Sequence, residues 1–369
     1  MSKKWQNMSN VPKLRFKDFS GEWEESKLKE YCFNISSGKS KNIEGGEYYL
    51  YGSTGIIGNT DKFTHNGTYI LIARVGANAG LTNLIKGKFG VTDNTLILDL
   101  DKEKSNISFI LSLLHKYNLN RLIFGSGQPL ITGGQLKSLK LYFPQKQEQE
   151  KIASFLNQVD TKIEQLTKKE KLLQQYKKGV MQKIFNQEIR FQADDGSEFC
   201  DWEEKRLKEV LDYEQPTKYI VESTEYNGNY NTPVLTAGKT FILGYTNEEN
   251  GIYTNSPVII FDDFTTANHY VDFDFKVKSS AMKLLKEKNE NICLKFVYEF
   301  IQKLHFPIGE HKRYWISEYS YLKIKLPCLE EQIKIANFLS SIDTKIEQTQ
   351  KQLEQTKEFK KALLQQMFV

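Results

Sequence analysis

Two long stretches decide the fold, because one is a copy of the other. Residues 144–185 read PQKQEQEKIASFLNQVDTKIEQLTKKEKLLQQYKKGVMQKIF, and residues 327–368 read PCLEEQIKIANFLSSIDTKIEQTQKQLEQTKEFKKALLQQMF. The copies align without a gap from their first proline to their last phenylalanine, and 19 of the 42 pairs are identical. The longest unbroken identity is DTKIEQ, at 160–165 and 343–348. A duplicated unit of this length predicts a chain built from two copies of one structural plan.

Each copy has the apolar spacing of a long helix that packs along another helix. Apolar residues recur every three or four positions, which is the heptad pattern of a coiled coil. Pro144 and Pro327 stand just ahead of the two helices, where proline is tolerated. The predicted coiled-coil seam consists of Ile152, Leu156, Val159, Ile163, Leu166, Leu173 and Val180 in the first copy and of Ile335, Leu339, Ile342, Ile346, Leu353, Leu363 and Met367 in the second.

Polar residues interrupt both seams. Glu170 and Lys177 occupy seam positions in the first copy, and Thr349, Thr356 and Lys360 do so in the second. Polar groups at such positions cost stability and can fix the register or the choice of partner. The alternative for each copy is a solitary amphipathic helix that lies on a globular domain, but two copies of one seam favour each other as partners.

The order of segments along the chain predicts the direction of the helix pair. A helix of about 38 residues is roughly 57 Å long, whereas a compact domain of ~120 residues has a radius of gyration near ~14 Å. The second globular segment starts where the first helix ends and finishes where the second helix begins, so parallel helices would force it to span the whole rod. We therefore expect an antiparallel pair, with the globular segments at opposite ends and related by a pseudo-two-fold axis.

Length and composition allow two or three folded domains. The chain has 369 residues, of which 39% are hydrophobic and 12% aromatic, and its net charge of +5 permits an acidic partner such as DNA without requiring one. The sequence shows no membrane-spanning run and no hydrophobic signal segment, so we expect a cytoplasmic protein. No CxxC pair occurs among Cys32, Cys200, Cys293 and Cys328, so we expect reduced thiols that act as small hydrophobic residues.

A second, weaker repeat surrounds the helices. Leu14-Arg15-Phe16 precedes GEWEE, and Ile189-Arg190-Phe191 precedes DWEE. We interpret Trp23 and Trp202 within these phrases as core anchors rather than as base-stacking residues. The predicted organisation is a lead-in with a globular domain over 1–143, a helical spacer over 144–187, a second lead-in with a globular domain over 188–326, and a second helical spacer over 327–369.

The two globular segments share one predicted plan but differ in their loops. A helix capped by Ser105 is expected over 105–117, and its counterpart over 291–303. Glycine turns are expected at Gly52, Gly55, Gly58, Gly76, Gly80, Gly87 and Gly90. Strands are expected at 48–51, 68–73, 95–98 and 139–143 in the first segment and at 233–235, 257–261 and 322–326 in the second. Because the helices diverged little and the loops diverged strongly, the pattern indicates one scaffold that presents two different readers.

Motifs that would make the chain an enzyme are missing from the sequence. It has no GxxxxGK[ST] phosphate loop, no Asn/Asp-Pro-Pro-aromatic loop of an amino-methyltransferase and no clustered Cys and His for zinc. We interpret the glycines and hydroxyls of 52–55 as a tight turn rather than as a phosphate cradle. Asp262 with Asp263, or Asp272 with Asp274, could hold a metal ion, but we expect solvated turn carboxylates. The sequence therefore predicts a binding protein without catalysis and without a metal site.

The chain resembles, over nearly its whole length, the DNA specificity (S) subunit of type I restriction–modification systems. The phrases that carry the resemblance are PKLRF at 12–16 with GEWE at 21–24, and both copies of the helical phrase P…EQxKIAxFL…DxxI. The loop SGQPLIT at 126–132 is similar to one common in the first recognition domain of that family. Its counterpart EHKRYWIS at 310–317 departs from the family pattern, so no base-contact role transfers to it.

The resemblance implies an α+β fold with two pseudo-repeated α/β target recognition domains, separated by two long helices that form an antiparallel coiled coil. Each domain would read one half of a bipartite, asymmetric target on double-stranded DNA, and the coiled coil would set the spacer. The subunit itself would be non-catalytic and would bind no cofactor. Two methyltransferase subunits would use S-adenosylmethionine for adenine methylation, and restriction subunits would use ATP and Mg²⁺.

Candidate DNA contacts are polar and basic residues in the expected loops, since such side chains contact phosphates and base edges. They are Lys39, Tyr51, Ser53, Thr54, Arg74, Asn78, Ser126 and Gln128 in the first segment and Lys218, Thr236, Lys239, Thr240, His269, Lys312, Arg313 and Tyr314 in the second. Each of them could equally be an ordinary solvated loop residue. Partner subunits are expected on the outer faces of the two helices. Two other classes stay open, namely a coiled-coil scaffold that does not read DNA, and an enzyme such as a nuclease or a recognition–methyltransferase fusion.

Overall fold

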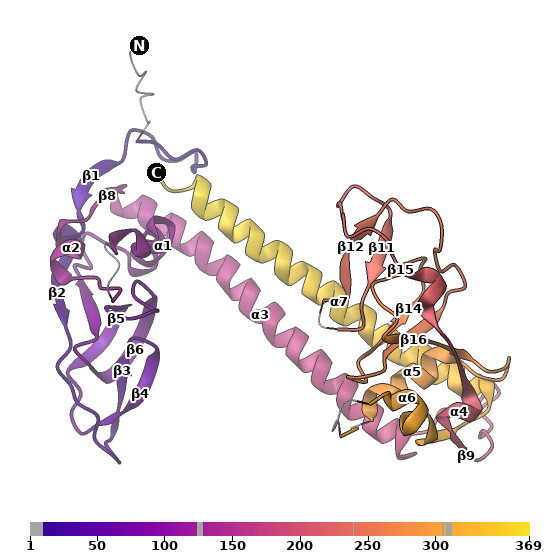
Figure 1. The fold of residues 1–369 in the computed structure, drawn as a ribbon. Coiled ribbons are helices and arrows are strands. Elements are labelled where there is room, and N and C mark those ends of the chain that lie inside the picture. The colour runs from indigo at the N-terminus through magenta and orange to yellow at the C-terminus, as the bar shows by residue number, and fades with distance from the viewer. Residues whose placement is uncertain (1–9, 124–127, 239, 305, 308–311) are drawn as a thin grey trace, which may run out of the picture. The chain divides into compact units, whose positions relative to one another are not determined.

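The computed structural model describes residues 10–123, 128–238, 240–304, 306–307 and 312–369 (Figure 1). The chain divides into two compact units, Met1–Lys168 with Gln350–Val369, and Lys169–Thr349. Each unit combines one globular domain with a stretch of each long helix. We call them the first unit and the second unit, and their globular parts the first domain and the second domain.

A six-stranded sheet forms the body of the first domain. Its strand order is β2-β7-β5-β6-β3-β4, so the long β5–β6 hairpin lies at its centre. Ile70, Ile72 and Leu98 on the central strands are fully buried. The strands are β2 (Cys32–Ser37), β3 (Tyr48–Gly52), β4 (Gly55–Thr60), β5 (His65–Ala73), β6 (Thr82–Val91) and β7 (Thr95–Leu100).

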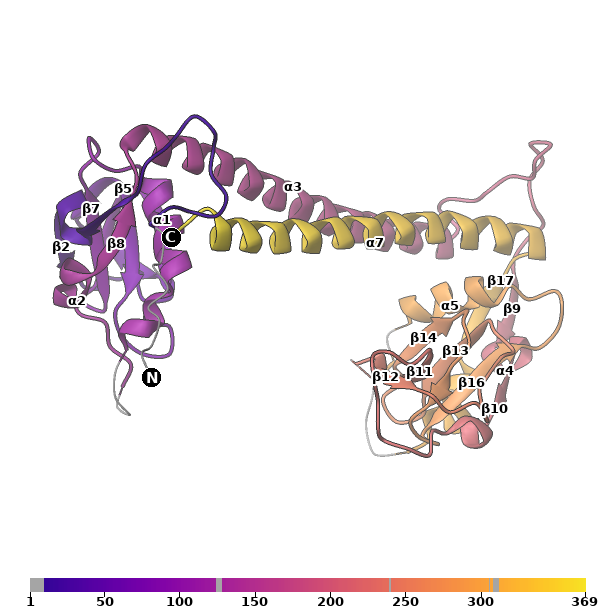
Figure 2. The same cartoon turned by 90° about the horizontal axis from the view of Figure 1, so that it is seen from above.

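One helix covers a face of this sheet. α1 (Ile107–Tyr117) lies against the strands in Figure 2, and its Phe109 joins the buried core. The N-cap of α1 is Asn106, whose side chain accepts a hydrogen bond from Phe109 N at 3.1 Å, so the prediction of Ser105 as the cap is wrong. Ser105 instead donates to Asp101 O at 2.7 Å. The other short helices of the domain are η1 (Leu28–Tyr31), η2 (Leu119–Leu122) and α2 (Gly133–Ser138).

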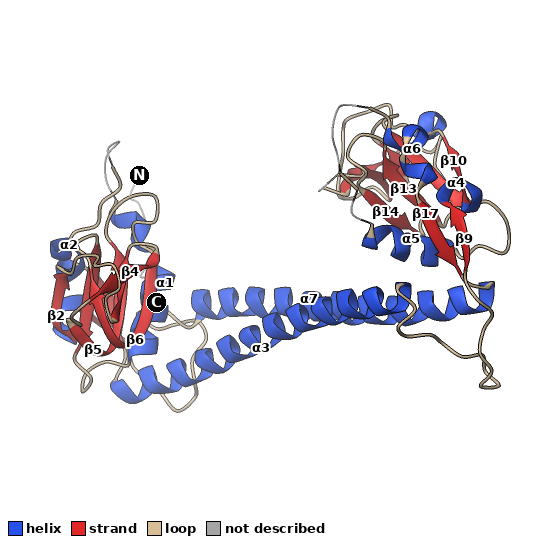
Figure 3. Cartoon of the chain, turned by 90° about the horizontal axis from the view of Figure 1, so that it is seen from below, coloured by secondary structure: helices blue, strands red, loops and turns tan. Residues whose placement is uncertain are grey.

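The second domain repeats the core of this sheet. The strands β10-β16-β13-β14 have the same antiparallel neighbours as β2-β7-β5-β6. α5 (Leu294–Lys303) lies beside them (Figure 3), and its Phe296 occupies the core as Phe109 does in the first domain. The prediction of one fold in two copies is therefore confirmed.

A separate sheet, of order β12-β11-β15, completes the second domain. The strands of the second domain are β10 (Leu211–Glu214), β11 (Thr232–Leu235), β12 (Ile242–Thr246), β13 (Val258–Asp262), β14 (Asn268–Val271), β15 (Lys276–Val277) and β16 (Met282–Glu287). Its short helices are α4 (Leu207–Val210), η3 (Pro216–Tyr219), α6 (Tyr314–Ser317) and η4 (Tyr319–Tyr321).

Three glycines that the sequence predicts in turns lie inside strands of the first domain. Gly58 is in β4, and Gly87 and Gly90 are in the ten-residue strand β6. Gly87, with φ of +124°, pairs with Gly67 of β5, with φ of +145°. Since other residues rarely adopt these angles, the glycines permit an unusual backbone within the hairpin rather than at its end.

A two-stranded ladder joins the lead-in of each domain to its last strand. β1 (Glu24–Lys27) pairs with β8 (Lys140–Phe143), and β9 (Glu203–Arg206) pairs with β17 (Lys323–Leu326). In both domains the last strand leads directly into a long helix. Each lead-in is thereby fixed next to the start of the helix that follows its domain.

A buried glutamate at the start of the first long helix fastens the first lead-in. Glu148 is 2% exposed and accepts hydrogen bonds from Arg15 Nε at 2.7 Å and from Arg15 Nη2 at 2.8 Å. Trp23 Nε1 also donates to Glu148, at 3.4 Å, and the Trp23 ring is almost completely buried. Charge-assisted hydrogen bonds of this kind offset the cost of burying the carboxylate.

The same arrangement recurs at the start of the second long helix. Glu331 is fully buried and accepts hydrogen bonds from Arg190 Nη2 at 2.9 Å and from Trp202 Nε1 at 3.0 Å. Trp202 packs against the core of the second domain, as Trp23 packs in that of the first. Both tryptophans are therefore anchors, and the prediction is confirmed.

The two long helices are antiparallel in each unit. α3 (Lys146–Phe185) and α7 (Leu329–Gln366) begin two residues after Pro144 and Pro327 (Figure 1). In the described part of the chain, no helix is both long and apolar enough to cross a membrane. The start of α3 packs against the end of α7 in the first unit, and the end of α3 packs against the start of α7 in the second. The buried contacts are Ile152, Leu156, Val159, Leu363, Met367 and Phe368 in the first unit and Met181, Ile184, Phe185, Ile335, Leu339 and Ile342 in the second.

The predicted seam residues are withdrawn from solvent. The buried ones are Ile152, Leu156, Val159, Leu166, Ile335, Leu339, Ile342, Leu353, Leu363 and Met367, and the half-buried ones are Ile163, Leu173, Val180 and Ile346. The two lysines at seam positions form ion pairs across the helices. Lys177 Nζ lies 2.7 Å from Asp343 in the second unit, and Lys360 pairs with Asp160 in the first. In the alignment of the two helical copies, Lys177 corresponds to Lys360 and Asp343 corresponds to Asp160, so the two ion pairs are equivalent.

Candidate nucleic-acid interface

Three loops of the first domain meet beside the end of the central strand β5. Ser53 Oγ donates to Asn94 O at 2.7 Å, and Arg74 N donates to the same oxygen at 2.9 Å. Thr92 N donates to Tyr51 O at 3.0 Å. These hydrogen bonds fix the β3–β4 turn, the segment after β5 and the β6–β7 turn relative to one another.

Arg74 brings a guanidinium group to this loop cluster. Its backbone is bonded on both sides, because its carbonyl accepts a hydrogen bond from Ile131 N at 2.8 Å. Its half-buried side chain reaches Asp93 O through Nη1 at 3.4 Å, which is a weak contact. Within the described residues its buried Nε has no hydrogen-bond partner. An unpaired buried donor is costly, and a guanidinium held in this way suits recognition of guanine or of phosphate.

The other predicted contacts of the first domain differ in exposure. Tyr51 is half-buried and lies edge-to-face on Phe89 with ring centroids 5.4 Å apart, so its ring packs on the sheet. Gly76 N donates to Pro129 O at 3.0 Å, which ties the segment of Gln128 to the segment of Asn78. Ser126 lies outside the described residues. The exposed predicted contacts are Lys39, Thr54, Asn78 and Gln128.

The β11–β12 turn of the second domain corresponds to the β3–β4 turn of the first. Thr236 Oγ1 donates to Thr240 O at 2.8 Å and closes the turn. His269 of β14 stacks on Phe241, which follows the turn, with ring centroids 4.3 Å apart and 26° between the planes. Burial lowers the pKa of His269 below its usual value, so the ring is neutral near pH 7.

Tyr314 is a core residue and not an exposed loop residue. Its side chain is 1% exposed and lies edge-to-face on Phe306, with ring centroids 5.4 Å apart. The expectation of an exposed Tyr314 is therefore wrong, because the ring packs into the domain. Lys239 lies outside the described residues. The exposed predicted contacts of the second domain are Lys218, Thr240, Lys312 and Arg313.

Asp263 holds the segment that carries Lys312 and Arg313. Tyr314 N donates to Asp263 O at 2.8 Å, and Trp315 N donates to Asp263 Oδ1 at 2.9 Å. Asp263 is 2% exposed, so the expectation of a solvated turn carboxylate is wrong. The Trp315 N–H and an ion pair with a buried lysine, described next, offset the cost of burying this carboxylate.

Lys283 is the buried partner of Asp263, with Nζ and Oδ2 3.4 Å apart. This charge pair was not expected from the sequence. A signal was present, because Lys283 stands in the strand sequence MKLL and Asp263 directly follows the apolar strand β13. A charge inside an apolar strand indicates a buried partner of opposite sign.

The other three aspartates considered for a metal site behave as turn or surface residues. Asp262 Oδ1 accepts hydrogen bonds from Phe264 N at 2.9 Å and from Thr265 N at 2.7 Å. Asp272 and Asp274 are exposed. Among the residues that the structure describes, no group of three or more His, Cys, Asp or Glu side chains could hold a metal ion.

The four cysteines are free thiols. Burial raises the pKa of Cys32 to about 12, so this thiol stays protonated at neutral pH. Cys200 is exposed, and the expectation that it packs as a small hydrophobic residue is wrong.

Arg74 and Asp263 occupy equivalent positions in the two domains. Each directly follows a central strand of its sheet, β5 or β13. Arg74 N donates to Asn94 O at 2.9 Å, and Asp263 N donates to Ala281 O at 3.0 Å, in both cases just before the neighbouring strand. Each carbonyl also accepts an N–H of a distant segment at 2.8 Å. One backbone framework therefore carries a cation in the first domain and a buried anion in the second.

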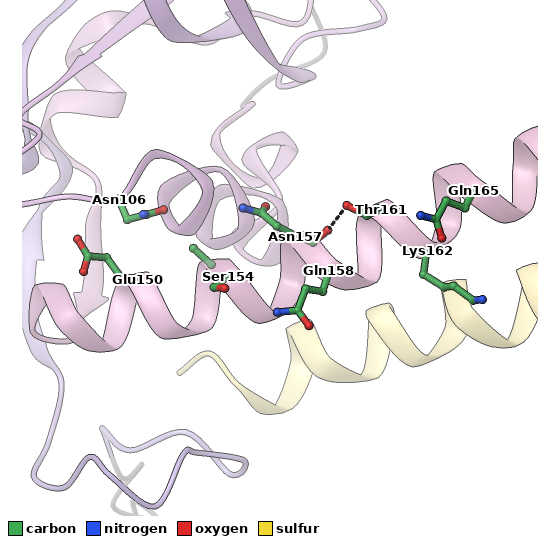
Figure 4. Close-up of a pocket in the computed structure, with 9 residues that line it drawn as sticks. Asn106, Glu150, Ser154, Asn157, Gln158, Thr161, Lys162 and Gln165 are labelled. Carbon is green, nitrogen blue, oxygen red and sulfur yellow. Dashed lines mark hydrogen bonds between the residues drawn. The ribbon is translucent and has the colours of Figure 1, made fainter.

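An open groove of about 640 Å³ runs along one face of α3 beside the N-terminus of α1 (Figure 4). All but one of its side chains are polar, and they can form hydrogen bonds with a protein surface. The groove is lined by Asn106, Glu150, Ala153, Ser154, Asn157, Gln158, Thr161, Lys162 and Gln165. α7 has the same residue at four of these helical positions, namely Ala336, Thr344, Lys345 and Gln348. The polar face is thus repeated only in part, since the exposed Ile333 stands at the position of Glu150.

Two copies of one α/β domain, each followed by a long helix, define a protein built from a duplicated unit. The profile of the family described as "Type I restriction modification DNA specificity domain" matches residues 20–174 and again residues 200–358. The chain belongs to this family and contains two copies of its domain.

Similar proteins agree with this assignment. The chain is 55% identical over 141 residues to the specificity subunit of the type I restriction enzyme EcoR124I/EcoR124II from Escherichia coli, an alignment that covers 37% of the chain and only 35% of that protein. It is 26% identical over 407 residues to the type I restriction enzyme MjaVIII specificity subunit from Methanocaldococcus jannaschii, which covers 95% of the chain and 94% of that subunit. The crystal structure of a type I restriction–modification S subunit from M. genitalium superimposes with a TM-score of 0.72 at 19% identity, over 97% of this chain and 99% of that one, and so shows the same fold.

Proposed function

We propose that this chain is the DNA specificity subunit of a type I restriction–modification complex, and that each domain reads one half of a bipartite target on double-stranded DNA. The observation that carries this proposal is the contrast between a shared strand framework and loops of opposite chemistry, with Arg74 in the first domain and Asp263 in the second. Two readers of different chemistry select different base sequences, so the composite target is asymmetric.

The coiled coil sets the number of base pairs between the two half-sites. α3 has 40 residues and α7 has 38, and their antiparallel packing in each unit supports this role. In other DNA-binding proteins the separation of the two reading elements fixes the separation of the half-sites. A rigid helical spacer does the same for two domains of a single chain.

Two methyltransferase subunits bind to the outer faces of the helices. Four of the eight α3 positions that line the groove carry the same residue in α7. Tyr176 and Phe359, which occupy equivalent positions in the two helical copies, are 53% and 51% exposed. Large apolar side chains left in solvent at equivalent positions suit two copies of one partner. Restriction subunits complete the complex.

The chain itself supplies recognition and not chemistry. S-adenosylmethionine belongs to the methyltransferase subunits, which methylate adenine, and ATP and Mg²⁺ belong to the restriction subunits. The rival functions are a coiled-coil scaffold that does not read DNA and a DNA-modifying enzyme. A scaffold would not bind DNA even with its partners present. An enzyme would modify DNA without them.

Co-expression with a type I methyltransferase subunit that binds this chain, followed by genome-wide mapping of adenine methylation, tests the proposal. The expected result is one split, asymmetric motif with a constant gap. As a matched control, exchange of residues 206–326 with those of another specificity subunit should change one half of the motif and leave the other half intact. A complex that assembles but neither methylates nor binds DNA would support the scaffold, and modification of DNA by the chain alone would support the enzyme.

A further inference from the structure

A buried charge pair lies behind the part of the second domain that carries Lys312 and Arg313. Asp263 and Lys283 are 2% and 1% exposed, and Lys283 Nζ also lies 5.1 Å from the centre of the Tyr213 ring. Burying two charges is costly, and apolar residues of similar size often stabilise a fold at least as well. Stability alone therefore gives little reason for this pair, and its hydrogen bonds indicate what else it does.

Asp263 caps the short helix α6 from another part of the chain. Tyr314 and Trp315 are the first two residues of α6, and their N–H groups donate to Asp263 O at 2.8 Å and to Asp263 Oδ1 at 2.9 Å. Arg313 stands at the N-cap and makes no side-chain capping bond. The first N–H groups of a helix need acceptors, and Asp263 supplies two from a position 52 residues from Trp315 in the sequence.

The first domain satisfies the corresponding N–H group locally. Thr132 N, which corresponds to Trp315 N, donates to Gln135 Oε1 at 2.8 Å within a capping box. In the second domain the residue three positions after Trp315 is Glu318, whose carboxylate pairs with Lys312. The carboxylate of Asp263 thus takes over the role of the Gln135 side chain.

The side chains of this segment divide between the core and the solvent. Tyr314 and Trp315 are 1% and 2% exposed, and Trp315 lies edge-to-face on Phe261 with ring centroids 5.4 Å apart. Lys312 and Arg313, directly before them, are exposed. With its backbone bonded to Asp263, the segment has one orientation in which the two aromatic rings are buried and the two cations face outward.

We infer that Asp263 is a positioning residue for DNA reading by the second domain, and that Lys283 offsets the cost of burying its charge. Asp263 does not touch DNA. It fixes the backbone of α6 so that Lys312 and Arg313 are presented in one geometry. The inference rests on the proposed function of the chain as a DNA reader. It adds a buried residue that affects sequence specificity without contacting DNA.

Two charge-free double variants separate the hydrogen bond from the ion pair. D263N/K283M removes both charges but keeps an oxygen that can accept from Trp315 N. D263A/K283M removes the charges and the acceptor together. The ion pair between Glu214 and Lys286, whose charged atoms are 2.6 Å apart, lies further along the same strand β16, and E214Q/K286M is the matched control.

Each variant is assembled with the methyltransferase subunit, and its methylated motif is mapped. D263N/K283M and E214Q/K286M should reproduce the wild-type motif. D263A/K283M should lose about five- to hundredfold in discrimination at the half-site assigned to the second domain, and nothing at the other half-site. A wild-type motif from D263A/K283M overturns the inference, and so does equal relaxation by D263N/K283M and D263A/K283M.

Hydrogen exchange keeps the inference testable if D263A/K283M does not fold. In the wild type and in D263N/K283M, the amides of Tyr314 and Trp315 should exchange at least tenfold more slowly than that of Arg313. Wild-type exchange at the Trp315 amide as fast as at Arg313 overturns the inference. This measurement needs no DNA, whereas a wild-type complex without any methylated motif would count against the proposed function instead.

Discussion

Lys177 and Asp343 form an ion pair across the two long helices, with Nζ and Oδ1 2.7 Å apart. Lys177 Nζ also lies 2.8 Å from Glu299 of α5, whose side chain is completely buried. Lys360 and Asp160 repeat the helix pair in the first unit, and within the described residues no third carboxylate joins them. The second unit therefore depends on its seam lysine more strongly than the first.

Replacement of Lys177 by Met should lower the free energy of unfolding by about 3 kcal/mol, because it leaves the buried Glu299 without its nearest cation. Lys360→Met should cost ~1 kcal/mol or less, because its pair with Asp160 is partly exposed to water. Urea denaturation followed by circular dichroism measures both. Equal losses of stability in the two variants would show that the buried Glu299 does not add to the cost of removing Lys177.

Lys177 should also make stability depend on alkaline pH. Burial alone lowers the pKa of Lys177, but attraction by Glu299 and Asp343 outweighs burial, and the pKa is raised above the usual lysine value of 10.5. A raised pKa gives stability that is fully present below the unfolded-state value and is lost as the pH rises through the folded-state value. The stability difference between wild type and K177M should therefore be constant from pH 7 to 9 and shrink above about pH 10.5. A difference that grows with pH would contradict this assignment.

The sequence could predict the long helices, their direction and the duplicated domain plan. The patterns that carry these predictions are visible in the sequence itself. Heptad spacing, Pro144 and Pro327, and the constant offset between the copies need no knowledge of distant contacts. The strands β6 and β16 could not be predicted in this way. β6 contains Gly87, and β16 contains Lys283, so both violate local strand preference and exist because of partners distant in sequence.

The candidate interface was predictable only at the level of residue type. Arg74 and Arg313 could be chosen because arginine suits DNA, but polarity does not reveal which side of a loop faces inward. The prediction of an exposed Tyr314 is therefore wrong, since its orientation depends on a backbone hydrogen bond to Asp263, which is distant in the sequence. Asp263 was misjudged for the same reason, because its backbone and ion-pair partners come from other segments.

Glu148→Gln should loosen the lead-in of the first domain. The variant leaves the Arg15 guanidinium without a charged acceptor, and the expected loss is about 2 kcal/mol of unfolding free energy. Glu150→Gln on the same helix is the control, because that side chain is 56% exposed and its loss should stay within ~0.5 kcal/mol. Thermal unfolding followed by intrinsic tryptophan fluorescence, and limited proteolysis near Lys17, report the change. Equal stability of the two variants would argue against the buried clamp.

Tyr176→Ala and Phe359→Ala should each weaken the binding of one methyltransferase subunit. Both rings are about half exposed, so the fold should lose less than ~0.5 kcal/mol, whereas removal of an aromatic anchor from an interface costs about 2 kcal/mol, or roughly thirtyfold in affinity. Native mass spectrometry should show one bound partner for each single variant and none for the double variant at limiting concentration. Gln175→Ala, an exposed neighbour, is the control. Two bound partners in the double variant would place the contact elsewhere on the chain.

Arg74→Ala should relax specificity at the half-site that the first domain reads, by about 1–3 kcal/mol of discrimination between the cognate base pair and its competitors. Arg74→Lys should not restore it, because lysine lacks the planar pair of donors that recognises a guanine edge. The exposed Lys39 provides a contrast, since Lys39→Ala should weaken binding to all sequences alike. It should also reduce the steepness of the plot of log binding constant against log salt concentration by about 1. Binding of the assembled complex to duplexes substituted in either half-site, measured over a range of salt concentrations, separates the two effects. If R74A weakens cognate and substituted duplexes equally, Arg74 contacts phosphate and the guanine assignment is wrong.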